Sequence, residues 1–266
     1  MTSGQLKQRI MITRPAHQAG KLANDIKNSG GETFIFPTLE INAVELSSQD
    51  KEKILQISQF DIIIFISPNA IEHGMNQIQS ITSLPDNISL ATIGQGSANA
   101  LKTKFGRLPD IFPEKSFNSE GLLATSAMQN VANKRILIIR GNGGREHLKQ
   151  TLEQRGAFVD YLNVYQRVKP DVDCSELEQY LQKNEIAVIV ITSAESLKNL
   201  VELTPKKAIL NLLNLPLLLI NNLLVDVARK TGFKNKLIVA TEASDEAIFD
   251  TLKENILLSV MHRQDQ

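Results

Sequence analysis

Residues that bind anions recur directly after short apolar runs of this sequence. Arg14 follows the run at 9–13, and Arg140 follows the run at 135–139. A guanidinium group donates two parallel hydrogen bonds to a carboxylate, which suits it to acidic ligands. The turns after the other apolar runs offer hydroxyl groups and close backbone access. The residues of this kind that we select as candidate ligand contacts are Arg14, Ser67, Asn69, Ala70, Gly94, Ser97, Arg140, Gly141, Gly143, Gly144, Arg145 and Ser193.

Turns of this composition place free backbone N–H groups at the starts of helices, where peptide dipoles favour negative charge. A simpler interpretation is open for each residue. Ser67, Ser97, Ser119 and Ser193 also fit the role of helix caps, and the two arginines fit that of surface cations. Because these residues, apart from Ser119, follow apolar runs, we expect them at one edge of a sheet, where open parallel sheets bind ligands.

The loop Gly141–Gly144 raises the possibility of a nucleotide site. In the dinucleotide fingerprint the third glycine falls at position 146, which is Glu146, so a carboxylate would face the phosphates. No lysine and hydroxyl of a phosphate-binding loop follow. A nucleotide-binding module is therefore our lowest-ranked function.

Composition excludes several classes of protein. The 29 basic and 29 acidic residues give a formal charge of zero, which disfavours nonspecific binding to nucleic acid or to membranes. One cysteine and four scattered histidines show no metal-ligand spacing, so we expect no metal. Asparagines and Pro216 interrupt the leucine-rich stretch 208–227, and Met1–Arg9 lacks the apolar core of a secretory signal. We expect a cytoplasmic monomer.

The chain contains an internal duplication. Arg140 lies 126 residues after Arg14, and the same offset superimposes the apolar runs at 62–67 and 188–193 without a gap. It also places Gly30 on Gly156 and Gly106 on Gly232. One register that holds over nearly the whole chain of 266 residues indicates two copies of one domain-sized unit.

Each copy alternates short β-branched runs with segments of helical period, which predicts an α/β fold with a doubly wound parallel sheet. Pro15 suits a first helical position, and glycines at 30 and 156 suit helix ends. The partner helix is expected to begin near Arg145. Two irregular segments, Pro37–Glu45 and Tyr165–Asp173, occupy equivalent places and are the predicted crossings between domains. The predicted strands are 9–13, 33–36, 61–66, 88–93, 135–139, 157–162, 186–192, 216–220 and 236–240.

Several motifs together resemble those of the uroporphyrinogen-III synthase family. The most distinctive is Leu137-Ile-Ile-Arg-Gly-Asn-Gly-Gly-Arg-Glu146, followed by Arg155-Gly-Ala157 and Tyr165-Gln-Arg167. The other matching segments, in order along the chain, are Ile12–Pro15, Phe65–Ile71, Ile93–Leu101, Asn118–Leu123, Ile191–Ser193 and Ala243–Ile248.

The resemblance implies two flavodoxin-like domains joined by a two-stranded linker, with segments exchanged between the copies. One domain would hold 1–37 with 170–266, the other 39–166, and the linker 37–41 with 165–170. It also implies an enzyme without cofactors. The implied substrate is hydroxymethylbilane, a linear tetrapyrrole with acetate and propionate arms, which is dehydrated and closed into uroporphyrinogen III with its last ring inverted.

Two site residues are implied by the same resemblance. Tyr165 matches the family's tyrosine and would assist departure of the hydroxyl group, since a phenol remains protonated at neutral pH; a tyrosine packed over the linker is the alternative. Arg167 would contact substrate. The turn Ile220–Leu223 departs from the family, which more often has a hydroxyl and a basic residue there. A nonenzymatic two-lobed protein that binds a small anion is the alternative function.

Overall fold

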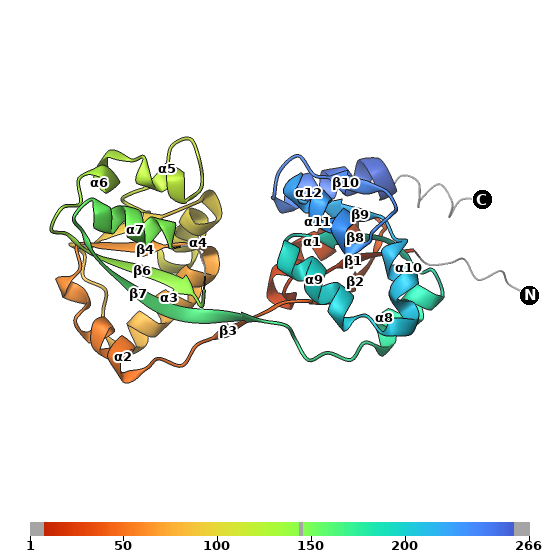
Figure 1. Ribbon diagram of the computed structural model, residues 1–266, viewed down its shortest axis with the longest axis horizontal. Helices are drawn as coiled ribbons and strands as arrows, with labels where there is room; N and C mark the ends of the chain where they lie inside the picture. Colours follow the sequence, from red (N-terminus) through yellow and green to blue (C-terminus); the bar gives the residue numbers. More distant parts are fainter. Residues whose placement is uncertain (1–7, 144–145, 258–266) are drawn as a thin grey trace, which may run out of the picture. The chain divides into compact units, whose positions relative to one another are not determined.

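The computed structural model describes residues 8–143 and 146–257. The chain divides into two units, each with its own five-stranded sheet (Figure 1). Unit 1 comprises Met1–Glu40 and Val168–Gln266, and unit 2 comprises Ile41–Arg167. Unit 1 is therefore built from both ends of the chain, and unit 2 is continuous.

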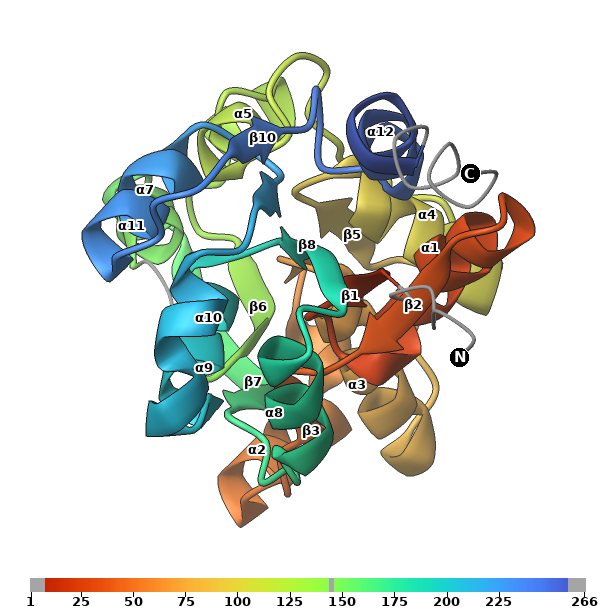
Figure 2. The same ribbon diagram turned by 90° about the vertical axis from the view of Figure 1, so that its right-hand side faces the viewer.

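Unit 1 has a parallel sheet in the order β10-β9-β8-β1-β2 (Figure 2). Its strands are β1 (Arg9–Ile12), β2 (Glu32–Ile35), β8 (Ile186–Ile191), β9 (Leu217–Leu219) and β10 (Leu237–Val239). Its helices are α1 (Ala16–Asn28), α8 (Ser175–Gln182), α9 (Ala194–Leu203), α10 (Ile209–Leu213), α11 (Leu223–Thr231) and α12 (Asp245–Leu252), with a 3-10 turn at Lys206–Ala208 and a π-helical turn at Lys253–Leu257.

Both faces of this sheet are covered by helices. Helix α1 buries Ala19, Leu22, Ala23 and Ile26, a spacing that forms one apolar stripe. With α12 it packs on the sheet face that carries Ile10 and Ile12. The alternate residue Met11 faces the other core, beneath α8, α9, α10 and α11. The expected double winding follows from this alternation.

Unit 2 has the order β3-β7-β6-β4-β5, and β4 to β7 pair in parallel. One face packs against α2, α3 and α4, and the other against α5, α6 and α7. Its strands are β3 (Glu40–Ala43), β4 (Ile62–Phe65), β5 (Ser89–Thr92), β6 (Arg135–Gly141) and β7 (Phe158–Val168). Its helices are α2 (Ser48–Leu55), α3 (Pro68–Ile81), α4 (Gln95–Phe105), α5 (Ser119–Leu123), α6 (Ser126–Gln129) and α7 (His147–Gln154), with a 3-10 turn at Ile57–Gln59.

The predicted α/β class with parallel sheets is confirmed, with some local corrections. The segments predicted to be irregular contain strand β3 and the end of β7. Pro15 is the residue before α1, not its first residue. Helix α7 begins at His147, and Arg145 lies outside the described residues. The paired glycines at helix ends share a left-handed backbone, with φ of 85° and 84° at Gly30 and Gly156 and of 68° and 109° at Gly106 and Gly232.

Over the described residues, no helix is long and apolar enough to cross a membrane. The same part of the chain contains no group of three or more histidine, cysteine, aspartate or glutamate side chains placed to hold a metal ion.

Candidate functional site

The predicted polar turns after the strands do lead into helices. Some of their serines cap the helix, and others lie within it. The Ser67 hydroxyl accepts the Ala70 N–H at 3.1 Å at the start of α3, and Ser193 accepts the Ser196 N–H at 3.0 Å at the start of α9. These two serines are caps, and the Ala70 N–H is already used. Ser97 and Ser119 are not caps, because Gly94 precedes α4 and Asn118 caps α5.

Tyr165 and Ser67 meet at the carboxyl end of the unit 2 sheet. The phenol oxygen of Tyr165 lies 3.1 Å from the hydroxyl oxygen of Ser67, and the tyrosine is 2% exposed. The ring of His73 lies on one side, 5.9 Å away between centroids. The backbone of Gly141 lies so close that a Cβ there would stand 2.6 Å from the Tyr165 ring. The tyrosine is thus held by a hydroxyl, a ring and a glycine.

A break in strand register directs Tyr165 to this place. Arg140 pairs with Asn163, but the next residue, Gly141, pairs with Tyr165, so β7 holds one extra residue. Tyr161 packs against the core beneath α5 and α7, whereas Tyr165 packs with Leu162 and Val164 on the opposite face. Without this bulge, period-two alternation would put both tyrosines on one face.

Arg140 forms a second cluster with Glu146 and Tyr161. Its guanidinium donates to the Glu146 carboxylate at 3.0 Å and lies 4.2 Å from the centre of the Tyr161 ring. The Tyr161 hydroxyl donates to the other Glu146 oxygen at 2.8 Å. The hydrogen bonds from Tyr161 and Arg140 lower the pKa of Glu146 below its usual value. Burial, and then the hydrogen bond to Glu146, raise the pKa of Tyr161 to about 12.

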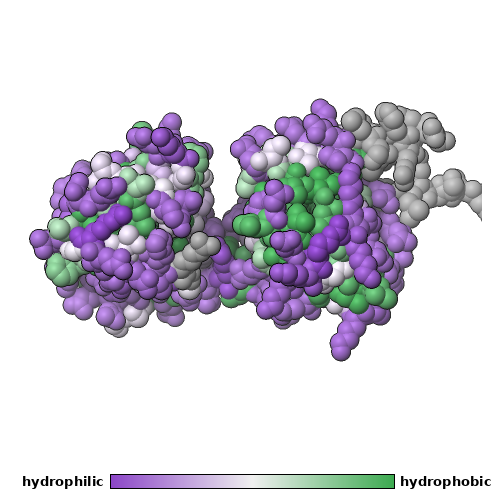
Figure 3. Space-filling view, turned by 45° about the horizontal axis from the view of Figure 1, so that its top comes forward, coloured by the Kyte–Doolittle hydropathy of each residue, from purple (hydrophilic) through white to green (hydrophobic). Residues whose placement is uncertain are grey.

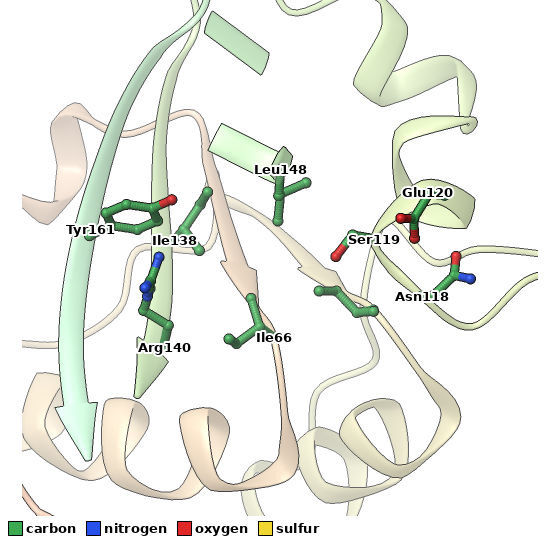
Figure 4. A pocket seen from close by; sticks show the side chains of 9 residues that line it. Ile66, Asn118, Ser119, Glu120, Ile138, Arg140, Leu148 and Tyr161 are labelled. Atoms are coloured by element: carbon green, nitrogen blue, oxygen red, sulfur yellow. The ribbon is translucent and has the colours of Figure 1, made fainter. Parts of the chain in front are cut away.

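This cluster borders a cavity of about 320 Å³ within unit 2 (Figure 4). Arg140 and Tyr161 lie at one end, and Asn118, Ser119 and Glu120 lie at the other. Apolar side chains form the walls between these ends: Ile66, Ile93, Ile138 and Leu148. The cavity therefore has a cationic end, an apolar middle and a polar end with a carboxylate.

In unit 1 the equivalent arginine pairs with a carboxylate from a different helix. Arg14 forms an ion pair with Asp245, the first residue of α12, and 13% of its side chain is exposed. Asp245 corresponds by the duplication to Ser119, which has no charge and lines the cavity of unit 2. Beside Arg14, Thr13 and Ser196 are buried and hydrogen-bonded at 2.9 Å. The two copies thus neutralise their arginines from different positions.

Unit 1 and unit 2 also differ in what they expose at the start of one equivalent helix, α11 in unit 1 and α4 in unit 2. Figure 3 shows an apolar area on unit 1 surrounded by hydrophilic residues. Leu223, which stands where the duplication has Ser97 in unit 2, is 80% exposed, whereas Ser97 is 3% exposed. The departure of Ile220–Leu223 from the expected turn thus replaces a buried hydroxyl by an exposed leucine.

The remaining candidates are distributed over both units. Asn69 lies in the first turn of α3, Gly143 follows β6 with φ of 76°, and Arg167 is exposed on β7. Gly144 and Arg145 lie outside the described residues. The structure brings together Ser67, Gly141 and Tyr165, and separately Arg140 with its partners, while Arg14 and Ser193 belong to unit 1.

Three residues of this site, Tyr161, Glu146 and Ser119, were not among the ligand contacts predicted from the sequence. Glu146 was evidence against a nucleotide site and the last residue of the family motif, but it was not selected as a ligand contact. Tyr161 lies in strand β7. The sheet face that it occupies depends on how β7 pairs with β6, which the sequence does not show. Only Asn118 and Ser119 carried a recognisable pattern, a helix start after an irregular segment.

Comparisons with known proteins give one family. The family model described as Uroporphyrinogen-III synthase HemD matches residues 20–250. The Uroporphyrinogen-III synthase of Escherichia coli (strain K12) is 31% identical over 249 residues, which cover 92% of this chain and 99% of that protein. The Uroporphyrinogen-III synthase of Proteus mirabilis is 34% identical over 194 residues, covering 72% of this chain and 96% of that one.

Solved structures agree at the level of the fold. A mutant uroporphyrinogen III synthase from Thermus thermophilus has a TM-score of 0.61 at 17% identity, with 96% of this chain and 99% of that chain covered. Uroporphyrinogen-III synthetase from Helicobacter pylori 26695 has a TM-score of 0.61 at 16% identity, with 93% and 99% covered. With the family match and relatives above 30% identity over nearly their full length, this chain belongs to the uroporphyrinogen-III synthase family.

Proposed function

We propose that this protein is a lyase that dehydrates and cyclises hydroxymethylbilane to uroporphyrinogen III, a step of heme biosynthesis. One observation carries the proposal: the chain spans 99% of the Escherichia coli uroporphyrinogen-III synthase at 31% identity. The cationic and hydroxyl-bearing ends of the strands support it, since the substrate carries several carboxylates.

The reaction as we propose it needs little acid–base chemistry from the protein. The terminal hydroxyl leaves as water and gives an electron-poor azafulvene. The substituted carbon of the last pyrrole attacks this centre to form a spiro intermediate, which fragments and recloses with that ring inverted. Pyrrole electrons drive these steps, so the protein acts chiefly by holding the chain in the reactive conformation.

The residues proposed to hold the substrate lie at the ends of the strands. Arg140 would bind a carboxylate, and the turns after Ser67, Gly94 and Ser193 would supply polar contacts. The other proposed contacts within the described residues are Arg14, Asn69, Ala70, Ser97, Gly141, Gly143 and Arg167. We propose Tyr165 as the donor to the leaving oxygen. Its phenol contacts Ser67, which is only half-buried, so an oxygen that reaches Ser67 comes within reach of this pair.

Both units are proposed to be flavodoxin-like domains joined by a two-stranded linker, with 1–37 and 170–266 in one domain and 39–166 in the other. The strand order of unit 1 supports this: numbered along its own chain, it is 2-1-3-4-5. Further support comes from the places where the chain passes between the units, Glu40–Ile41 and Arg167–Val168.

We propose that the enzyme works as a cytoplasmic monomer, without metal or cofactor and without nucleic acid. The formal charge of zero supports the last point, because nonspecific binding to nucleic acid depends on basic side chains.

A product assay tests the function. Purified protein is incubated with hydroxymethylbilane, and the porphyrins obtained after oxidation are separated by chromatography. Isomer III in excess over that in a heat-inactivated control is expected, and spontaneous closure accounts for isomer I. If only isomer I forms while the substrate still binds, the protein is a binding protein and the proposed activity is wrong.

A further inference from the structure

The residues that line the cavity beside Arg140 are complementary to an apolar ligand with an acidic group at one end and a hydrogen-bond donor at the other. A ligand that fills it needs an acidic group at the Arg140 and Tyr161 end, an apolar body against Ile66, Ile93, Ile138 and Leu148, and a hydrogen-bond donor at the Glu120 end (Figure 4). Its volume of about 320 Å³ is at the small end of the range for ligand pockets, roughly 300–1,000 Å³. It can therefore hold one ring with its arms.

A carboxylate of the protein already pairs with both residues of the cationic end. Glu146 accepts hydrogen bonds from Arg140 at 3.0 Å and from Tyr161 at 2.8 Å, one on each oxygen. The arginine and the glutamate differ in exposure: 7% of the Arg140 side chain is exposed, against 50% of that of Glu146. The arginine is fixed in the sheet, whereas the glutamate lies at the surface and is replaceable.

A buried guanidinium needs a counter-charge, because an unpaired buried cation is strongly destabilising. Glu146 provides that charge, and any second carboxylate must compete with it for the same two donors. Among the described residues, two further charged groups lie near the cluster: Glu120 at the far end of the cavity, and Lys149, whose nitrogen is 5.0 Å from the Tyr161 ring centre. Glu120 disfavours an acidic group at its own end and favours an N–H donor there.

We propose that this cavity is the binding site for one pyrrole ring of the substrate, and that the ring's carboxylate arm displaces Glu146 from Arg140 and Tyr161. The ring would lie between the apolar walls, with its N–H directed to the Asn118 and Glu120 end. This assignment rests on the proposed function for the identity of the ring.

The corresponding pair in unit 1 is less suited to such an exchange. There the carboxylate that holds Arg14 is Asp245, and only 19% of its side chain is exposed, against 50% for Glu146. A ligand carboxylate approaching from solvent therefore meets a more deeply buried competitor at Arg14 than at Arg140. This difference assigns the pyrrole site to unit 2.

The test uses a single pyrrole with one acetate and one propionate arm, titrated calorimetrically into the full-length protein. We expect Glu146→Gln to bind it roughly tenfold more tightly than wild type, because a neutral amide accepts weaker hydrogen bonds than a carboxylate does. Glu153→Gln is the matched control. Glu153 lies on the same helix, α7, with 44% of its side chain exposed and Lys149 as its partner. It should leave the affinity unchanged.

Methyl resonances in the wild-type protein locate the bound ring. Titration should shift the methyl signals of Ile66, Ile93, Ile138 and Leu148, and should leave those of Ile10 and Ile12 in unit 1 unchanged. Adipate, a dicarboxylate without a ring, should bind much more weakly.

Three results would overturn the assignment: equal or weaker binding by Glu146→Gln, shifts confined to other methyl groups, or adipate binding as tightly as the pyrrole. Formation of isomer III from the full tetrapyrrole is measured with the same samples. The calorimetric result needs no turnover, so it tests the cavity assignment alone. Formation of isomer III tests the proposed activity.

Discussion

The ring of Tyr165 rests directly on the backbone of Gly141, where a Cβ would stand 2.6 Å from two of its carbons. These are neighbouring residues of β6 and β7 at the site of the bulge. The glycine is needed for space, and the tyrosine can reach Ser67 only while that space remains.

Gly141→Ala should displace the Tyr165 ring and lower the free energy of unfolding by about 1–3 kcal/mol, the usual cost of overpacking. Urea unfolding measures the loss. Gly20→Ala is the comparison, since Gly20 lies in α1 and a Cβ added there would meet nothing within 4 Å. That change should stabilise by about 0.5–1 kcal/mol. Equal stability of Gly141→Ala and wild type would show that the ring has room to move.

Tyr165→Phe should lower kcat about a hundredfold and change KM little, because the phenyl ring keeps the packing and loses only the proton donor. Steady-state formation of isomer III measures both constants. Tyr180→Phe, in α8 of unit 1, removes a hydroxyl that bonds Glu176 and should have no effect. An unchanged kcat for Tyr165→Phe would eliminate the proposed proton donation.

Arg140→Ala should raise KM by at least about tenfold, since it removes a charge-assisted contact to a substrate carboxylate. Arg135→Ala is the matched control: it lies at the opposite end of the same strand, where its guanidinium contacts Gln59. Wild-type KM in Arg140→Ala would show that this guanidinium does not bind substrate.

The pKa of Tyr161 gives a pH-dependent prediction. Burial and Glu146 raise the pKa of Tyr161 to about 12, from about 10 in an unfolded chain. The stabilisation that comes from this shift is therefore fully present below pH 10. That contribution is lost as the pH rises through about 12. Glu146→Gln should lower this pKa, because it weakens the hydrogen bond to the phenol and removes the negative charge beside it. Phenolate absorbance follows the titration, and Tyr161→Phe identifies the signal. No change in Glu146→Gln would contradict the hydrogen bond.

A buried hydroxyl network in unit 1 predicts a loss of stability. Thr38 is fully buried, lies 2.7 Å from the Ser196 hydroxyl and donates to the Thr13 carbonyl at 3.3 Å. Thr38→Val keeps the shape and removes both bonds, so unfolding should become easier by about 1–3 kcal/mol. Thr103→Val, at an exposed position of α4, should cost much less. Thermal unfolding compares the two variants, and similar losses would argue against a special role for the network.

Much of the fold could be predicted from the sequence because its causes are local and repeated. Apolar runs and glycine stops recur at one offset, and the four paired glycines do adopt the left-handed conformation that ends a helix. Strand β3 was missed, since Glu40–Ala43 is short and mostly exposed and is a strand only because β7 pairs with it.

The site was harder to predict because its contacts join distant parts of the chain. No local pattern shows that Asp245 pairs with Arg14, 231 residues away. The bulge that separates the faces of Tyr161 and Tyr165 arises from the register of two strands, and the cavity arises from side chains of several strands, turns and helices. Residue types could indicate anion binding, but not which carboxylate each arginine meets.

The discontinuous composition of unit 1 has a consequence for its synthesis. Strand β1 pairs with β2 and with β8, and Ile10 must wait for Val188 to leave the ribosome before the sheet can extend. The strands of unit 2, β3 to β7, are made in the meantime. Unit 2 can therefore fold during synthesis while β1 and β2 still lack the rest of their sheet. We expect chaperones to bind these amino-terminal strands in that interval.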